Sequence, residues 1–115
     1  KKNVRLAVLS NKPHRQTVKV VREIFGEGVF DCIEGQQEGI ARKPDPAGVF
    51  RLLERMQISG EECLYAGDSE VDILTGKNAK VRTVGVTWGF RNRETLLKAG
   101  AETVIDKPEE LLRFV

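Results

Sequence analysis

Two carboxylates, Asp68 and Asp72, stand four residues apart, directly after a short apolar run that ends at Gly67. One interpretation is a helix N-cap followed by a solvated first-turn acid, since the N-terminal end of a helix stabilises negative charge. The other is a hard-cation site, because Mg²⁺ prefers one or two protein carboxylates together with waters and a substrate phosphate. Gly67 would let the backbone approach such a ligand.

A hydroxyl and an amine extend this candidate set. Ser10 follows the apolar run at residues 4–9 (VRLAVL), and Lys43 precedes Pro44 in a polar loop. Taken alone, Ser10 would cap the next helix and Lys43 would be a solvated loop residue. Taken together they suggest phosphate chemistry, because a hydroxyl can hold phosphoryl oxygens and a lysine supplies a point charge for the same group.

The elements that must position these residues alternate along the chain. Apolar runs predict strands at residues 4–9, 29–33, 63–66, 82–86 and 103–105. Apolar spacing of three and four, with capping residues, predicts helices near residues 14–25, 46–57, 71–79, 94–99 and 108–114. This alternation predicts an α/β fold, a three-layer Rossmann-like parallel sheet with helices on both faces. Ligands of such sheets bind beyond the carboxyl ends of the strands.

Three segments resemble known motifs in the order in which they occur. Residues 6–14 (LAVLSNKPH), 43–46 (KPDP) and 65–72 (YAGDSEVD) are similar to the second, third and fourth motifs of the haloacid dehalogenase superfamily, and most closely to its phosphoglycolate phosphatase-like branch. Residues 85–90 (GVTWGF) and 100–105 (GAETVI) are similar to later segments of that branch. The resemblance covers nearly the whole chain.

The resemblance implies a Mg²⁺-dependent phosphomonoester hydrolase that works through a phosphoaspartyl intermediate on a small phosphorylated metabolite. Ser10 would hydrogen-bond the transferring phosphoryl group, with Asn11 beside it. Lys43 would bind the same group and steady the negative nucleophile. Asp68 would ligate Mg²⁺, and Asp72 would act through a metal-bound water or as an anchor behind the ligands.

The first motif of the superfamily, an Asp-x-Asp that supplies the nucleophile, is not among these residues. The resemblance implies that it lies before Lys1, together with the helical cap that sets substrate specificity. We therefore expect residues 1–115 to be a partial, incomplete haloacid dehalogenase-like catalytic core, and a fragment that is inactive alone. The only methionine, Met56, is consistent with a piece of a longer protein.

The missing motif would also carry a central strand, between the strands that end near Ser10 and Asp68. Without it, both neighbours would have an open edge. Direct pairing of the two strands, filling of the gap by another molecule and poor folding are the three possible outcomes. We expect a rearranged or gap-filled sheet, and the exposed sheet edge makes self-association plausible.

Composition limits the remaining function classes. The 115 residues suffice for one domain, and 40% apolar with 31% charged residues is an ordinary globular balance. The net charge is +2 and like charges do not cluster, which argues against nucleic-acid and membrane partners. Cys32 and Cys63 lack metal-ligand spacing and are expected to be buried, reduced thiols of a cytoplasmic protein.

Two alternatives differ in class. A non-catalytic phosphate- or Mg²⁺-binding or regulatory module of the same fold stays open. A receiver-type signalling domain is disfavoured, because Ser10 and Asn11 stand where its acidic pair would follow the first strand. Arg91 and Arg93, beyond the fourth strand, are expected to be solvated.

Overall fold

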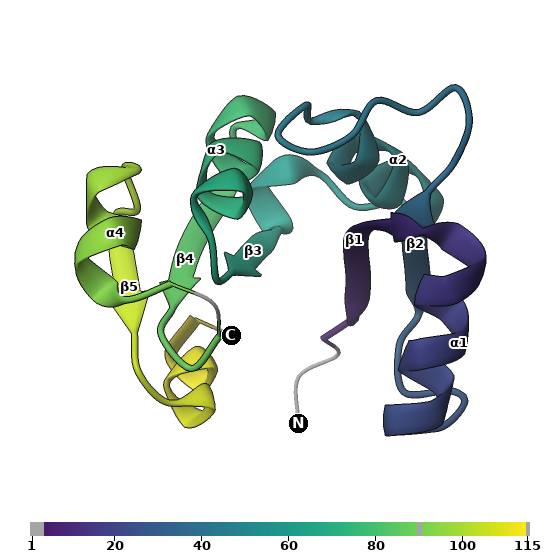
Figure 1. Ribbon diagram of the computed structural model, residues 1–115, viewed down its shortest axis with the longest axis horizontal. Coiled ribbons are helices and arrows are strands. Elements are labelled where there is room, and N and C mark those ends of the chain that lie inside the picture. Colours follow the sequence, from purple (N-terminus) through teal and green to yellow (C-terminus); the bar gives the residue numbers. More distant parts are fainter. Residues whose placement is uncertain (1–3, 90, 115) are drawn as a thin grey trace.

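Within residues 4–89 and 91–114, which the computed structural model describes, five parallel strands alternate with helices (Figure 1). The strands are β1 (Ala7–Pro13), β2 (Cys32–Gln36), β3 (Leu64–Gly67), β4 (Arg82–Val86) and β5 (Thr103–Ile105). The α-helices are α1 (His14–Phe25), α2 (Ala47–Met56), α3 (Glu70–Ala79) and α4 (Arg93–Lys98), and η1 (Gly60–Glu62) and η2 (Pro108–Phe114) are 3₁₀ helices. The alternation predicted from the sequence is confirmed.

Local signals explain where the helices begin and end. The Asp45 carboxylate accepts a hydrogen bond from the backbone N–H of Ala47 at 2.9 Å, which places the start of α2 one residue later than predicted. The Ser69 hydroxyl accepts from the backbone N–H of Asp72 at 3.4 Å and caps α3. α1 ends at Phe25 and is capped by Gly26, whose φ of 82° suits a residue without a side chain.

The strands lie in two separate sheets. β1 pairs with β2 in parallel, with Ala7 opposite Cys32, and β3, β4 and β5 form the second sheet in that order. In the described residues β1 and β3 are not hydrogen-bonded to each other, so the parallel sheet is interrupted between them, in agreement with the incomplete core that the sequence predicts. Direct pairing, the first of the three possible outcomes, is not what this chain adopts.

Helix packing joins the two sheets in place of strand pairing. Val49 and Leu53 of α2 form a buried cluster with Ala79 and Val81. Leu9 of β1 and Tyr65 of β3 pack against the same cluster, one from each sheet. Burial of apolar surface at this cluster, rather than a hydrogen-bond ladder, therefore holds the two sheets together.

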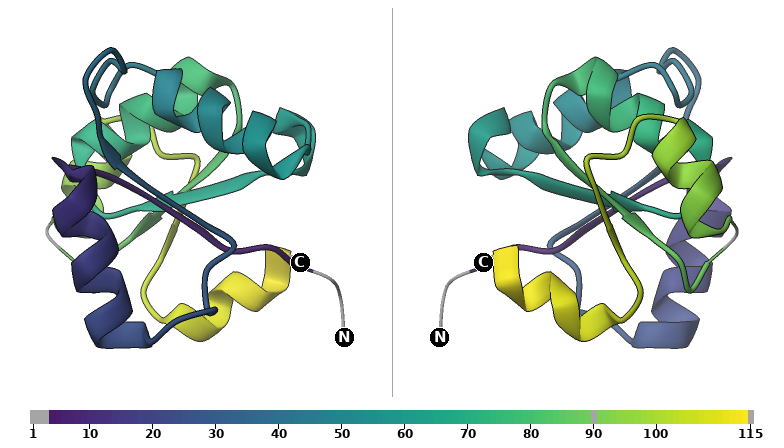
Figure 2. Two further views of the ribbon diagram at one scale, coloured as in Figure 1. Left: turned by 90° about the vertical axis from the view of Figure 1, so that its right-hand side faces the viewer. Right: turned by 90° about the vertical axis from the view of Figure 1, so that its left-hand side faces the viewer.

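The helices cover both faces of the strands in three layers. α2 and α3 lie on one side, and α1 and η2 lie on the other (Figure 2). α4 packs on the α3 side through Leu96, which contacts Ile73 in a fully buried cluster. Val84 of β4 points to the opposite side, toward η2. The arrangement is an incomplete Rossmann-like core.

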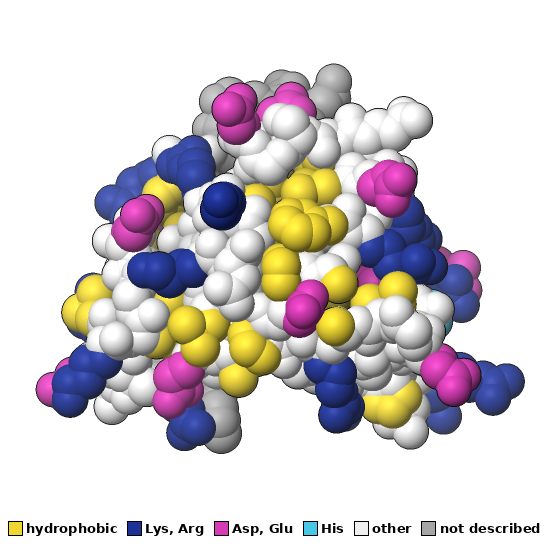
Figure 3. All heavy atoms as spheres, turned by 90° about the horizontal axis from the view of Figure 1, so that it is seen from above, with side chains coloured by type: hydrophobic (Ala, Val, Ile, Leu, Met, Phe, Trp, Pro, Cys, Tyr) yellow, Lys and Arg dark blue, Asp and Glu magenta, His cyan; other side chains and the backbone are white. Residues whose placement is uncertain are grey.

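The surface combines mixed charge with some exposed apolar groups. Seen from the side of α2 and α3, hydrophobic side chains are exposed near the middle, and lysines and arginines lie toward both sides (Figure 3). Phe50 and Leu74 are exposed apolar residues of these two helices.

In the described ranges, no helix has the length and apolar character needed to cross a membrane. Cys32 in β2 and Cys63, directly before β3, are free thiols, and both are half-buried rather than buried as the sequence predicted.

Candidate functional site

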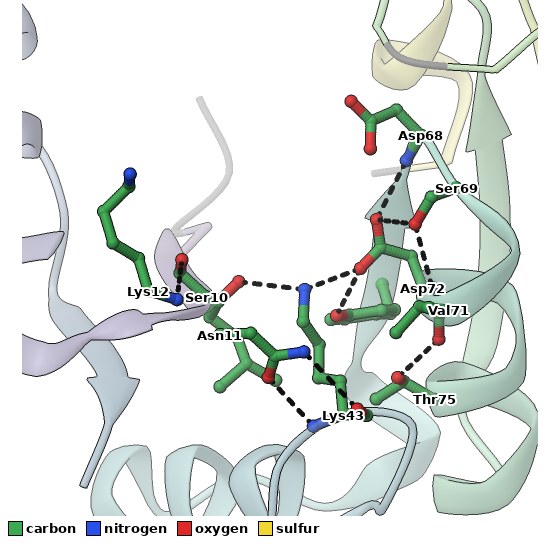
Figure 4. Close-up of polar contacts among 11 residues, drawn as sticks. Ser10, Asn11, Lys12, Lys43, Asp68, Ser69, Val71, Asp72 and Thr75 are labelled. Atoms are coloured by element: carbon green, nitrogen blue, oxygen red, sulfur yellow. Dashed lines mark hydrogen bonds and ion pairs between the residues drawn. The ribbon is translucent and has the colours of Figure 1, made fainter.

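An ion pair between Lys43 and Asp72 lies at the centre of the predicted site (Figure 4). The Lys43 ammonium is 2.7 Å from Asp72 Oδ1, and 3.5 Å from the backbone carbonyl oxygen of Leu9, to which it donates. The two side chains are 14% and 11% exposed. The loop before α2 therefore does reach the carboxyl edge of the strands, as the sequence interpretation required of Lys43.

The Asp72 carboxylate is held from several sides. Its Oδ2 accepts from the backbone N–H of Asp68 at 3.1 Å and from the Ser69 hydroxyl at 3.3 Å. Its Oδ1 accepts from the Tyr65 hydroxyl at 3.3 Å in addition to Lys43. Burial raises the pKa of Asp72, but the Lys43 ammonium and these donors outweigh burial, so the pKa is lowered overall. The carboxylate is therefore charged and fully engaged by protein donors.

Gly67 makes the approach of Asp72 possible. A Cβ atom at position 67 would lie 2.1 Å from Asp72 Cβ and 2.5 Å from its Cγ, distances that no real side chain tolerates. The sequence interpretation assigned the space beside Gly67 to a ligand. In the structure the Asp72 side chain occupies this space, because the first turn of α3 folds back onto the end of β3.

Asn11 braces the Lys43 loop. Its side-chain oxygen accepts from the backbone N–H of Lys43 at 3.0 Å, and its amide nitrogen donates to the Lys43 carbonyl oxygen at 3.4 Å. Arg42 donates to the Asn11 carbonyl oxygen at 3.0 Å. Both polar ends of the Asn11 side chain thus contact the backbone of Lys43 and hold it in position.

Ser10 and Asp68 stand on either side of the ion pair. Ser10 lies within β1 rather than at its end, and its hydroxyl accepts from the backbone N–H of Lys12 at 3.0 Å. It therefore does not cap α1, whose cap position is Pro13. The Asp68 carboxylate points away from the Asp72 carboxylate (Figure 4). All five predicted site residues come from segments that meet at this edge.

The donor set fits a hard cation in part. Both Asp72 oxygens accept from protein donors, and the Asp68 carboxylate, which points away from Asp72, is the second carboxylate at this edge (Figure 4). The described residues contain no group of three His, Cys, Asp or Glu side chains placed to hold a metal ion. Mg²⁺ keeps several water ligands and binds through one or two carboxylates, so Asp68 could supply one position but not a whole site.

Sequence reasoning missed several contacts at the same edge. Tyr65 reads as an apolar strand residue, yet its hydroxyl reaches Asp72. Arg91 and Arg93 are exposed, as expected, but they also form ion pairs with Glu70 at 2.8 Å and with Asp106 at 2.5 Å. The partners are distant along the chain, so no local pattern indicates these pairs.

The fold and the order of these segments define an incomplete Rossmann-like core, and comparison with known proteins identifies the family. The sequence profile of haloacid dehalogenase-like hydrolases matches residues 1–86, more than half of the chain. The chain therefore belongs to the haloacid dehalogenase-like hydrolase family, as the motifs predicted.

Individual relatives agree with this assignment. Phosphoglycolate phosphatase of Vibrio cholerae is 34% identical over 110 residues, which cover 96% of this chain and 49% of that protein. A proposed phosphoglycolate phosphatase from Lactobacillus delbrueckii has a crystal structure that superposes with a TM-score of 0.89 and 40% identity, over 94% of this chain and 45% of that one. The chain spans about half the length of the curated relatives it matches.

Proposed function

We propose that this chain is part of the catalytic core of a Mg²⁺-dependent phosphatase that hydrolyses small phosphomonoesters, phosphoglycolate being the first candidate. Membership of the hydrolase family and the names of the relatives support the class of reaction. The observation that carries the proposal is the Lys43 ammonium, fixed 2.7 Å from Asp72 at the carboxyl edge of the strands. A fixed ammonium at this edge suits the binding of a phosphoryl group.

The roles of this chain's residues follow from their contacts. Asp72 holds the Lys43 ammonium in place, and Asn11 fixes the backbone of the same lysine. Ser10 would donate its hydroxyl proton to a phosphoryl oxygen, since its oxygen already accepts from Lys12. Asp68 would hold Mg²⁺ together with water, substrate and groups outside this chain. The ion, when bound, neutralises charge on the phosphoryl group.

The reaction itself needs a nucleophile from outside these residues. An aspartate carboxylate of the first motif would attack phosphorus, and the P–O bond to the ester oxygen would break as that oxygen takes a proton from the acid/base aspartate of the same motif. That acid/base aspartate would then take a proton from the water that hydrolyses the phosphoaspartate. We propose that the strand carrying this aspartate fills the space between β1 and β3. The 115-residue chain alone is then inactive, and its open strands make it self-associate.

The test measures phosphate release by the naturally expressed protein from phosphoglycolate and a panel of other phosphomonoesters, with and without Mg²⁺. Lys43→Met and Asp68→Asn should each lower kcat/KM by about a hundredfold or more, the scale of losing an electrostatic contact to the transition state. Lys98→Met, at an exposed lysine of α4, is the matched control and should leave kcat/KM unchanged.

Two outcomes would count against the proposal. Hydrolysis that is indifferent to both Lys43 and Asp68 would remove these residues from the site. Mg²⁺-dependent phosphate binding without turnover of any ester, by the naturally expressed protein, would favour the alternative of a non-catalytic binding or regulatory module.

A further inference from the structure

We propose that Gly89 is a positioning residue for Asp68, and that the loop between β4 and α4 serves as a buttress that sets where the Asp68 carboxylate can lie. The inference rests on the proposed function in one respect, the assignment of Asp68 as a ligand of Mg²⁺. The positional claim itself rests on contacts between two loops that follow neighbouring strands, β3 and β4.

The first contact is one of space. A Cβ atom built at Gly89 would lie 2.2 Å from Asp68 Oδ2 and 2.4 Å from Asp68 Cβ. Real Cβ atoms essentially never come within 3.0 Å of another heavy atom, so any side chain at position 89 must displace Asp68. The backbone of Gly89 is not in the left-handed region. Glycine is therefore required here by the proximity of the carboxylate and not by conformation.

The second contact ties the loop to the turn that carries Asp68. The backbone N–H of Arg91 donates to the Asp68 carbonyl oxygen at 3.0 Å. The guanidinium of the same residue pairs with Glu70 at 2.8 Å, at the first residue of α3. Arg91 therefore contacts the turn on both sides of Ser69, the cap of α3: its backbone N–H binds Asp68 and its side chain binds Glu70.

Both ends of the loop are fixed to the rest of the core. Thr87 donates its backbone N–H to the Ile105 carbonyl oxygen at 3.1 Å and its hydroxyl proton to Asp106 at 2.7 Å. At the other end, the Asn92 side chain accepts from the backbone N–H of Thr95 at 2.9 Å and caps α4. Because this loop is held at both ends, it cannot move away from Asp68. Its position therefore limits where the Asp68 carboxylate can lie.

The experiment compares Gly89→Ala with Gly60→Ala in the naturally expressed protein. Gly60 is the matched control, because a Cβ there would meet only Val81 Cγ1 at an ordinary 3.5 Å, on η1. Crystal structures of the wild type and both variants locate Asp68, and calorimetric titration with Mg²⁺ alone measures affinity. We expect Gly89→Ala to displace the Asp68 carboxylate and to weaken Mg²⁺ binding by about tenfold or more, with Gly60→Ala unchanged in both.

Glu70→Gln is the second variant. It weakens the ion pair between Glu70 and Arg91 without adding volume. It should weaken Mg²⁺ binding by about twofold to threefold, a smaller effect because the backbone bond from Arg91 stays in place. This variant decides the matter if Gly89→Ala fails to fold. An Asp68 that keeps its position in Gly89→Ala, or equal losses of affinity in Gly89→Ala and Gly60→Ala, would overturn the inference. Wild type that binds no Mg²⁺ would refute the proposed metal role, and the crystal structures would still decide the positioning of Asp68.

Discussion

Lys43 and Asp72 form an ion pair that connects the two sheets, with Lys43 following β2 and Asp72 in the helix that follows β3. Their charged atoms are 2.7 Å apart and largely shielded from water. Water and salt screen such a pair much less than an exposed one. Loss of either partner leaves the other charge partly buried and poorly compensated, which is costly in free energy.

The first prediction is a measurable coupling across this pair. Asp72→Asn should lower the free energy of unfolding by about 3 kcal/mol, because the Lys43 ammonium loses its counter-charge. Urea unfolding of Asp72→Asn, Lys43→Met and the double variant should give a coupling energy above about 1 kcal/mol. Glu94→Gln is the control, since Glu94 meets Lys98 only at 3.9 Å on the surface, and it should cost under about 0.5 kcal/mol. A coupling energy near zero would mean that the two side chains lie close together but that their interaction does not stabilise the folded state.

The second prediction concerns pH. Burial raises the pKa of Asp72, and the Lys43 ammonium with the neighbouring donors lowers it further than burial raises it. The folded state thus binds this proton less tightly than the unfolded state, so the stabilisation is complete above the ordinary carboxyl pKa of 3.8. It is lost as the pH falls through the lowered pKa of the folded state. The stability difference between wild type and Asp72→Asn should be flat above about pH 5 and shrink below pH 4. A difference that grows on acidification would contradict the sign.

Much of the fold was predictable because its signals are local. The structure places α1 at His14–Phe25, β4 at Arg82–Val86 and β5 at Thr103–Ile105, the predicted bounds. β2 was predicted at residues 29–33 from the apolar run there, whereas the strand spans Cys32–Gln36 and includes the charged Glu34. The structure buries this carboxylate to 1% exposure within β2, where Arg51 and Arg55 of α2 neutralise it. Neutralisation by side chains of the next helix, beyond a long loop, has no local signal at Glu34.

The sequence predicted that the candidate residues would lie close together, but not which atoms each of them contacts. The shared edge of parallel strands brought Lys43 and Asp72 together, as the topology required. The brace from Asn11 and the approach of Gly89 to Asp68 depend on loop shapes that residue types do not determine. Local chemistry thus predicts which residues gather at an edge, whereas tertiary packing decides what each one touches.

The third prediction follows from the buried Glu34 carboxylate. Glu34→Gln keeps the size of the side chain but removes the charge that meets Arg51 and Arg55, so two charge-assisted contacts weaken. We expect a loss of about 2 kcal/mol in the free energy of unfolding, measured in urea. Glu54→Gln, at an exposed position of α2, the helix that carries both arginines, should change it by under about 0.5 kcal/mol. Equal effects from the two variants would show that the burial of Glu34 adds nothing.

The fourth prediction concerns the open strands. Within the described residues β3 pairs with β4 and not with β1, so one edge of β3 offers unpaired backbone groups. The isolated 115-residue chain should show a concentration-dependent mass by light scattering. Ala66→Lys, at an exposed position of β3, should shift it toward the monomer, because charge on an edge strand opposes pairing. Leu112→Lys removes an exposed apolar group of η2 and should not. A monomer at every concentration would exclude association through this edge.

The fifth prediction uses Tyr65, the single tyrosine of the chain, so that tyrosinate absorbance reports this residue alone. Burial raises the pKa of Tyr65 well above its ordinary value of 10.0, and the nearby Asp72 carboxylate raises it further. The folded state therefore holds the phenolic proton more tightly than the unfolded state, and stability is lost as the pH rises above that ordinary value. In an ultraviolet titration, tyrosinate should appear together with unfolding and not before it.

Asp72→Asn separates the two causes of this shift. It removes the negative charge beside the hydroxyl but leaves the burial, so the onset of ionisation should move only part of the way back toward 10.0. Far-ultraviolet circular dichroism on the same samples distinguishes ionisation in the folded state from unfolding. A wild-type phenol that titrates at its ordinary pKa with the fold intact would show that water reaches the Tyr65 hydroxyl freely, and the contact with Asp72 would then lose its role in holding the Lys43 site.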